Sequence, residues 1–435
     1  MATTITPTIV TLNVTVTEAP EPNQLQQSGA VVSAGGTTLA AGTYQYCGSL
    51  SAVLAILAAP VAITSLAWAS GVVTATVPTM ELAVGQTFLV TIAGAAPVGY
   101  NGTFVATVAT STTFTFPLTT GPGSETVPGT YTPPYSALVT QWATMHFAQG
   151  AVVGLYVLEL GAESTTVAGI TALTTWIADN LYTFYSCGVD PSWDSTGLKT
   201  LTGNYASPTS RLYFFFDTVQ NNLANYAGIK SVISTVPAPS APATEITAAA
   251  MMYQWIVQTP SAAAQALPMQ FRQLYGVTPW PAYGQSAAVN AILTAFGNLV
   301  YPGVEGGLPD NNYLFRGSAM DGNQAMFWYS VDWYQIQMKQ AQANAILNAA
   351  NQQPPIVYNQ QGINALKTVG NDVGNSAISF GLMLSVVLTA QSFATYTQQN
   401  PSNYAAGIYG GFLATVTPQL GFGSITFNVD ATTFA

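Results

Sequence analysis

One histidine and a few carboxylate pairs are the residues of this 435-residue chain whose types could do catalytic chemistry. His146 is the only histidine, so a Ser-His-Asp triad would have to use it, and no Gly-x-Ser-x-Gly turn is present. The pairs Asp190/Asp194 and Asp310/Asp321 could in principle act in glycoside hydrolysis. We interpret His146 as a buried structural side chain, because no second His or Cys offers metal-ligand spacing. The expectation is therefore no catalytic residue, no metal and no cofactor.

Charge is scarce and unevenly distributed along the chain. Lys, Arg, Asp and Glu make up 6% of the residues, against about a quarter in ordinary soluble domains, and the net charge is −10. The first 198 residues contain no Lys or Arg. Since phosphate binding requires a basic patch, we expect no direct contact with nucleic acid. Weak repulsion between copies favours a protein that assembles with itself.

Neither the apolar runs nor the two cysteines indicate a membrane or disulfide-rich protein. Residues 50–69 are uncharged, but Pro60 interrupts them and no basic residue flanks them, so we expect no stable membrane insertion. Residues 378–390 are shorter and are interpreted as a buried helix or strand. Cys47 and Cys187 lack CxxC spacing and are expected to be buried free thiols. The opening MATTITPTIV lacks the basic and apolar parts of a signal peptide, so export by that route is not expected.

The segment from 312 to 380 has the clearest turn and helix signals, beginning with a predicted hairpin. Residues 313–318 and 325–331 are rich in aromatic side chains. Between them stands Asp321-Gly322, a dipeptide that tolerates the positive φ angles of a tight turn. This pattern predicts a β-hairpin.

Two helices are predicted to follow that hairpin. Asp332 precedes Gln335 by three residues, as in a capping box, which predicts a helix starting at Trp333. The helix must end before Pro354, which removes a donor and restricts the residue before it. Asn359 is expected to cap the second helix. We expect Asp321, Gly322, Asp332 and Trp333 to serve the architecture of the core rather than chemistry.

The rest of the chain predicts two further kinds of structure. Between residues 60 and 134, short apolar runs separated by Gly, Pro and Asn predict a small all-β sandwich or barrel. After residue 150, strands alternate with helices, as in an α/β layer with parallel strands. The expected fold class is therefore α+β or α/β multidomain, with mixed sheets, helices and an inserted all-β domain. The β runs are residues 72–77, 87–92, 102–108 and 112–118, and the alternating elements are 152–160, 166–180, 182–187 and 212–216.

Both ends of the chain carry an alternating apolar strand pattern. Strands with so little charge can add to the sheet edge of a neighbour through backbone hydrogen bonds. We predict that the two terminal strands pair between subunits. The apolar positions are Val10, Leu12, Val14 and Val16 at one end and Ile425, Phe427 and Val429 at the other.

The order of these motifs resembles the core of contractile-tail sheath proteins from bacteriophages, and in particular a divergent group long known only as a phage family of unknown function. The resembling motifs are Asp332-Trp333, Ile356-Val357-Tyr358-Asn359 and Gly362, with Ser49, Val53, Ala143, His146, Phe147 and Gln149 in an earlier unit and Gly276–Pro279 between them. Residues 84–104 and 111–118 resemble a β-module inserted in various phage structural proteins. The chain departs from the family at Asn403-Tyr404-Ala405-Ala406, where relatives tend to carry an acidic-basic pair.

This resemblance implies a division of the chain and a set of partners. It implies an N-terminal strand arm (1–20), an α/β sheath domain (21–59 and 135–300), an outward-facing β-insert (60–134) and a C-terminal core domain with a terminal strand arm (301–435). Hexameric rings of the virion protein would stack helically around a tail tube, between baseplate and tail terminator proteins, after assembly in the host cytoplasm. Contraction would drive the tube through the host envelope, for genome ejection, without nucleotide. The helix at 361–376 would face the tube, with Lys367 as its base and Asp372 as its acid.

Two other classes of protein remain as alternatives. A surface-layer or adhesin-like β-rich protein would explain the neutral, Thr- and Ala-rich surface, and a signal peptide would favour it. Hollow striated cylinders in electron micrographs would favour the sheath. An enzyme is the third alternative, and it would be distinguished by an effect of His146 substitution beyond stability.

Overall fold

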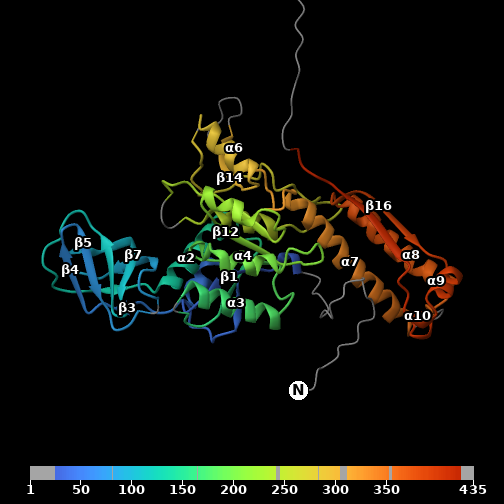
Figure 1. The fold of residues 1–435 in the computed structure, drawn as a ribbon, viewed down its shortest axis with the longest axis horizontal. Helices are drawn as coiled ribbons and strands as arrows, with labels where there is room; N and C mark the ends of the chain where they lie inside the picture. The colour runs from blue at the N-terminus through green and yellow to red at the C-terminus, as the bar shows by residue number, and fades with distance from the viewer. Residues whose placement is uncertain are drawn as a thin grey trace, which may run out of the picture.

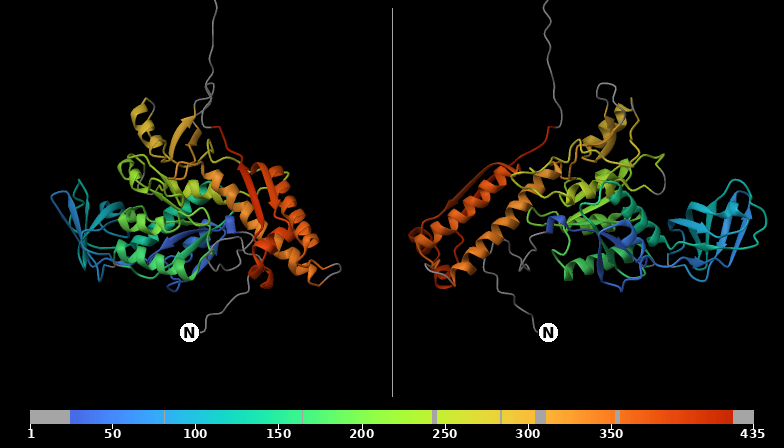
Figure 2. Two further views of the ribbon diagram at one scale, coloured as in Figure 1. Left: turned by 45° about the vertical axis from the view of Figure 1, so that its right-hand side comes forward. Right: turned by 180° about the vertical axis from the view of Figure 1, so that it is seen from behind.

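The computed structural model describes residues 25–80, 82–163, 165–241, 245–282, 284–303, 311–351 and 355–422. Its elements form a central α/β layer with an antiparallel β-sheet at one end and a C-terminal arm at the other (Figure 1). The same arrangement is visible from two further directions in Figure 2. Within the parts of the chain described, every helix is too short or too polar to be a bilayer-spanning segment.

The central layer is built on a six-stranded mixed sheet with the order β13-β12-β11-β1-β10-β2. Neighbouring strands are parallel, except that β2 runs antiparallel to β10 at one edge. Most of these strands are buried on both faces, as expected for a parallel sheet covered by helices. The strands are β1 (Gly29–Ser33), β2 (Tyr44–Cys47), β10 (Leu155–Glu159), β11 (Ser186–Gly188), β12 (Tyr213–Asp217) and β13 (Val232–Thr235).

Helices cover both faces of this sheet. Helices α2 and α5 pack together and contact β1, so they lie on one face. The connections β10–α3–β11 and β11–α4–β12 cross the sheet in the opposite direction from β1–α2–β10, and right-handed crossovers therefore place α3 and α4 on the other face. These four helices are α2 (Pro134–Ala148), α3 (Thr166–Asp179), α4 (Thr196–Gly203) and α5 (Thr247–Ile256). Helix α1 (Leu50–Leu54) contacts α2 and the edge strand β2, and α6 (Ser286–Thr294) contacts the short helix at Gln220–Tyr226.

The antiparallel sheet at the end of the molecule opposite the C-terminal arm has seven strands in the order β3-β9-β6-β7-β8-β5-β4 and forms a half-barrel. Alternate residues of β6 are buried, so one face of the sheet carries its core, which includes Phe88, Phe114 and Phe116. The mixed α/β fold class with an additional all-β sheet is thus confirmed. The strands are β3 (Val61–Ala62), β4 (Ser65–Ala69), β5 (Val72–Thr76), β6 (Thr87–Ala93), β7 (Gly102–Thr110), β8 (Thr113–Pro117) and β9 (Thr130–Tyr131).

The C-terminal arm consists of two long helices and a two-stranded sheet. Helix α7 extends away from the α/β layer, and α8 returns alongside α7. Strands β16 and β17 lie along α8 (Figures 1 and 2). The elements are α7 (Ala325–Ala349), α8 (Gln360–Ser379), β16 (Met383–Ala390), α9 (Phe393–Gln399), α10 (Pro401–Ala405) and β17 (Phe412–Pro418).

The predicted hairpin before this arm is wrong. Residues 325–331 are the first two turns of α7, and β15 (Asn311–Phe315) pairs instead with the preceding strand β14 (Leu299–Gly303). Helix α7 starts at Ala325, so Asp332 lies inside the helix and is not its N-cap. The tight turn itself is present, with Gly322 at φ +90°.

Other predictions for the arm have mixed outcomes. Asn359 caps α8 as predicted, its Oδ1 accepting a hydrogen bond from the Gly362 amide at 2.9 Å. Helix α7 ends at Ala349, before Pro354. Residues 378–390 are not a buried element, because they contain the turn to β16 and a strand whose alternate side chains are exposed. Strand β17 pairs antiparallel with β16.

Gly362 provides a test of the packing at the start of α8. A Cβ at this position would overlap the Val357 carbonyl oxygen, a backbone atom that cannot move unless the preceding turn shifts. We expect Gly362→Ala to lower the free energy of unfolding by about 2 kcal/mol, measured by chemical denaturation. Gly203→Ala in α4 is the control, because a Cβ there has no neighbour within 4 Å, and it should be neutral or stabilising by up to ~1 kcal/mol. Equal responses of the two variants would contradict this packing.

Candidate assembly surface

The sheet of the arm lies unusually close to α8. Gly370 and Gly374 stand beneath β16, where a Cβ on Gly374 would lie 2.9 Å from the Val386 side chain and a Cβ on Gly370 would overlap Leu388. Glycines weaken an isolated helix, but here they let the strand approach the helix backbone. The glycines of α8 therefore allow the sheet of β16 and β17 to pack closely on this helix.

The opposite face of this sheet is neutral and exposed. Leu388 faces α8 and is 8% exposed, whereas its neighbour Val387 is 56% exposed and Leu413 of β17 is 66% exposed. Ser and Thr side chains fill the remaining outward positions, at Ser385, Thr389, Thr415 and Thr417. Within the described residues the sheet has only two strands, so each strand has one edge whose backbone groups face no further strand. An uncharged face with two open edges can accept added strands, and we call it the assembly surface.

The arm is fixed to the α/β layer by a buried carboxyl group in α7. Asp332 is 0% exposed, and its Oδ2 accepts hydrogen bonds from the hydroxyl of Tyr213 in β12 at 2.7 Å and from the hydroxyl of Tyr185, the residue directly before β11, at 3.0 Å. Its other oxygen lies 3.8 Å from the Lys230 ammonium, close enough for an ion pair but not for a hydrogen bond. Burial raises the pKa of Asp332, while Lys230 and the two hydroxyls oppose that shift.

Lys230 completes this buried cluster from the loop before β13. Its ammonium donates a hydrogen bond to the Ser210 carbonyl at 2.6 Å and lies 4.5 Å from the centre of the Trp328 ring. Burial lowers the pKa of Lys230, and the Asp332 carboxylate opposes the shift. The pair thus joins the α/β layer to α7 through hydrogen bonds, a cation-π contact and opposite charges.

The other residues predicted to serve the core lie around this cluster. The Asp321 carboxyl accepts hydrogen bonds from the Trp328 indole at 2.7 Å and from the Asn323 backbone amide at 3.1 Å, next to the turn at Gly322. Trp333 is 9% exposed and packs edge-on against Phe380 at the end of α8, with ring centres 5.6 Å apart.

The residues predicted to face the tail tube fall within the described part of the chain, whereas those predicted to pair between subunits do not. Lys367 is half-buried and Asp372 is exposed, and both lie on α8. The terminal strand positions lie outside the described residues and are not placed; these are Val10, Leu12, Val14, Val16, Ile425, Phe427 and Val429.

The side chains considered for catalysis make hydrogen bonds within the fold. His146 is buried, with Nε2 3.1 Å from the Val153 carbonyl oxygen, and burial lowers its pKa to about 4. The Asp194 carboxyl accepts hydrogen bonds from Asn222 and Tyr226 at 2.9 and 2.7 Å. Cys47 and Cys187 are buried free thiols, as predicted. Across the described part of the chain, no group of three or more His, Cys, Asp or Glu residues is arranged to hold a metal ion.

Sequence reasoning missed the partners of Asp332. Tyr185, Tyr213 and Lys230 come from three separate segments of the α/β layer, up to 147 residues away in the chain. One signal was available: Asp332 stands in an apolar and aromatic stretch, where a carboxyl group needs a buried partner. The identity of that partner required the fold.

Loss of the Asp332 carboxyl should weaken the junction between the arm and the α/β layer. We expect Asp332→Ala to lower the free energy of unfolding by about 3–5 kcal/mol, because it leaves the Lys230 charge buried without its partner. The double variant Asp332→Ala, Lys230→Met should lose less than the single variant, since no charge then remains. Asp372→Ala, on the exposed side of α8, is the control and should change stability by less than ~0.5 kcal/mol. Equal losses for the single and double variants would contradict a charge-based junction.

Two solved structures resemble the chain over most of its length at low sequence identity. A sheath tail protein from Listeria innocua matches 93% of this chain and 96% of its own, with a TM-score of 0.43 and 12% identity. A sheath tail protein from Desulfitobacterium hafniense matches 87% of this chain and 93% of its own, with a TM-score of 0.40 and 10% identity. No protein-family model matches the chain, and no curated protein matches it in sequence. In structure, the chain is similar to sheath tail proteins.

Proposed function

We propose that the chain is the structural subunit of a contractile phage tail sheath and not an enzyme. The observation that carries this proposal is the assembly surface, which within the described residues is a two-stranded sheet with a neutral, exposed outer face and an open edge on each strand. Open, apolar strand edges promote association, and monomeric proteins usually protect them with charge, proline or a covering element. A subunit that is completed by its neighbours has no need of that protection.

Terminal strands of neighbouring copies are the proposed occupants of this surface. Val10 to Val16 and Ile425 to Val429 alternate apolar and polar residues, as a strand that covers an apolar face must. Such pairing uses backbone hydrogen bonds, which are independent of side-chain charge. It suits a chain in which only 6% of the residues are charged.

In the assembled particle, hexameric rings would stack around the tail tube between baseplate and terminator proteins. Helix α8 would face the tube with Lys367 and Asp372, and the half-barrel of residues 61–131 would face outward. Contraction would drive the tube through the host envelope while the paired strands keep the subunits connected. The protein would be part of the virion after assembly in the host cytoplasm.

Electron microscopy of the purified full-length chain, with and without tail tubes, tests this function. We expect hollow, striated cylinders of uniform diameter. Flat two-dimensional lattices would instead support a surface-layer protein, and monomers under all conditions would contradict both.

Charged substitutions on the assembly surface should prevent the cylinders without unfolding the subunit. We expect Val387→Asp together with Leu413→Asp to abolish sedimentable assemblies, because a neighbouring copy packed on the outer face of the sheet would bury two carboxylates without partners. Val98→Asp is the matched control, since Val98 is 79% exposed in the half-barrel, far from the arm. Sedimentation and circular dichroism measure assembly and folding separately. Normal assembly of the double variant would exclude this surface.

A further inference from the structure

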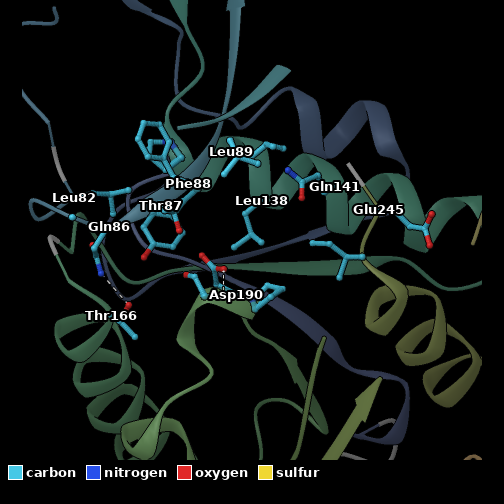
Figure 3. A pocket seen from close by; sticks show the side chains of 17 residues that line it. Leu82, Gln86, Thr87, Phe88, Leu89, Leu138, Gln141, Thr166, Asp190 and Glu245 are labelled. Carbon is cyan, nitrogen blue, oxygen red and sulfur yellow. Dashed lines mark hydrogen bonds between the residues drawn. The ribbon is translucent and has the colours of Figure 1, made fainter. Parts of the chain in front are cut away.

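A cavity of about 460 Å³ lies between the half-barrel and the α/β layer. Strands β6 and β7 form one wall, and the first turns of α2 and α3, the 190–192 turn and the segment before α5 form the other. Figure 3 shows Leu138 and Asp190 facing the same space from different elements. Its volume falls within the range of about 300–1,000 Å³ that is typical of small-molecule sites.

The polar side of the cavity offers acceptors and a hydroxyl donor. Asp190 Oδ1 accepts a hydrogen bond from the Ser192 amide at 2.8 Å, which leaves further acceptor positions on the carboxyl group. The Tyr135 hydroxyl accepts from the Trp193 indole at 3.3 Å, so its own hydrogen can be donated elsewhere. Gln141 adds an amide that can both donate and accept.

The charges around the cavity disfavour an anionic ligand. Among the described residues that line it none is Lys or Arg, whereas Asp190 and Glu245 are acids. Glu245 already accepts two hydrogen bonds from Thr278, at 2.8 and 2.6 Å. Asp190 is therefore the main acceptor for a ligand, and a compact metal ion lacks the further carboxylates it would need among the described residues.

The other side of the cavity is apolar. Leu82, Phe88, Leu138 and Ile246 line it from both walls. A ligand that fits must carry several hydroxyl groups that donate hydrogen bonds to Asp190 and Gln141. It must also present a face of C–H groups to the apolar wall. Sugar rings have this combination.

We propose that this cavity binds a neutral saccharide of one or two rings. The site is complete within one copy of the chain and requires no assembly. Because both walls contribute, a bound saccharide also links the half-barrel to the α/β layer, where Gln86 Nε2 already donates to Thr166 Oγ1 at 3.0 Å (Figure 3).

Calorimetric titration of the full chain with glucose, galactose, N-acetylglucosamine and lactose, each to 50 mM, about the weakest affinity such a titration resolves, tests the proposal. We expect saturable binding of at least one of them. Asp190→Asn and Gln141→Ala should each weaken that binding about tenfold or more, since the first replaces a charged acceptor oxygen with an amide donor and the second removes the Gln141 amide. Leu138→Trp should abolish it by filling the cavity. Asp372→Asn, on the exposed side of α8, is the matched control and should bind like the unmodified chain.

Three results would overturn the proposal. The first is that none of the four sugars binds saturably. The second is that a sugar binds but Asp190→Asn and Gln141→Ala leave its affinity unchanged. The third is that putrescine binds and the sugars do not. The last result would identify a cation site at the two acids. Circular dichroism of each variant confirms that a loss of binding does not come from unfolding.

Discussion

The position of the whole C-terminal arm depends on one buried junction between α7 and the α/β sheet. Two tyrosine hydroxyls, from the start of β12 and from the residue before β11, donate to the same oxygen of Asp332, at 2.7 and 3.0 Å, and Lys230 faces the other oxygen. Only one register of the helix satisfies this geometry, because a shift of one residue would turn the carboxyl group away from both hydroxyls. The junction therefore fixes the direction of a 25-residue helix, and α8, β16 and β17 follow from it.

The buried junction at the start of α7 contrasts with the two-stranded sheet of β16 and β17, whose outer face is exposed. Val386 and Leu388 pack onto the glycines of α8, so the two strands are well supported on one side. On the other side they present Val387 and Leu413 to solvent. A stiff arm that ends in an open sheet is suited to holding a neighbour at a fixed distance. The low charge of the chain means that such contacts would vary little with salt.

Local signals predicted local structure well and long-range structure poorly. Asn359 was recognisable as a cap because its partner, the Gly362 amide, is three residues away. Strand β1 was missed because its five residues are all buried and do not alternate. Asp332 has the spacing of a capping box, but its helix already begins at Ala325, and a carboxyl group in the helix interior is stabilised by partners that only the fold brings near. The open face of β16 was equally hidden, since an apolar strand has the same composition whether its partner is the same chain or another copy.

A map of the assembled particle at side-chain resolution tests the central claim most directly. We expect the sheet of β16 and β17 to gain strands from neighbouring copies at its edges, and a neighbouring copy to cover Val387 and Leu413 on its outer face. Edges of β16 and β17 that stay unpaired in the particle, or that pair only with strands of their own chain, would contradict it.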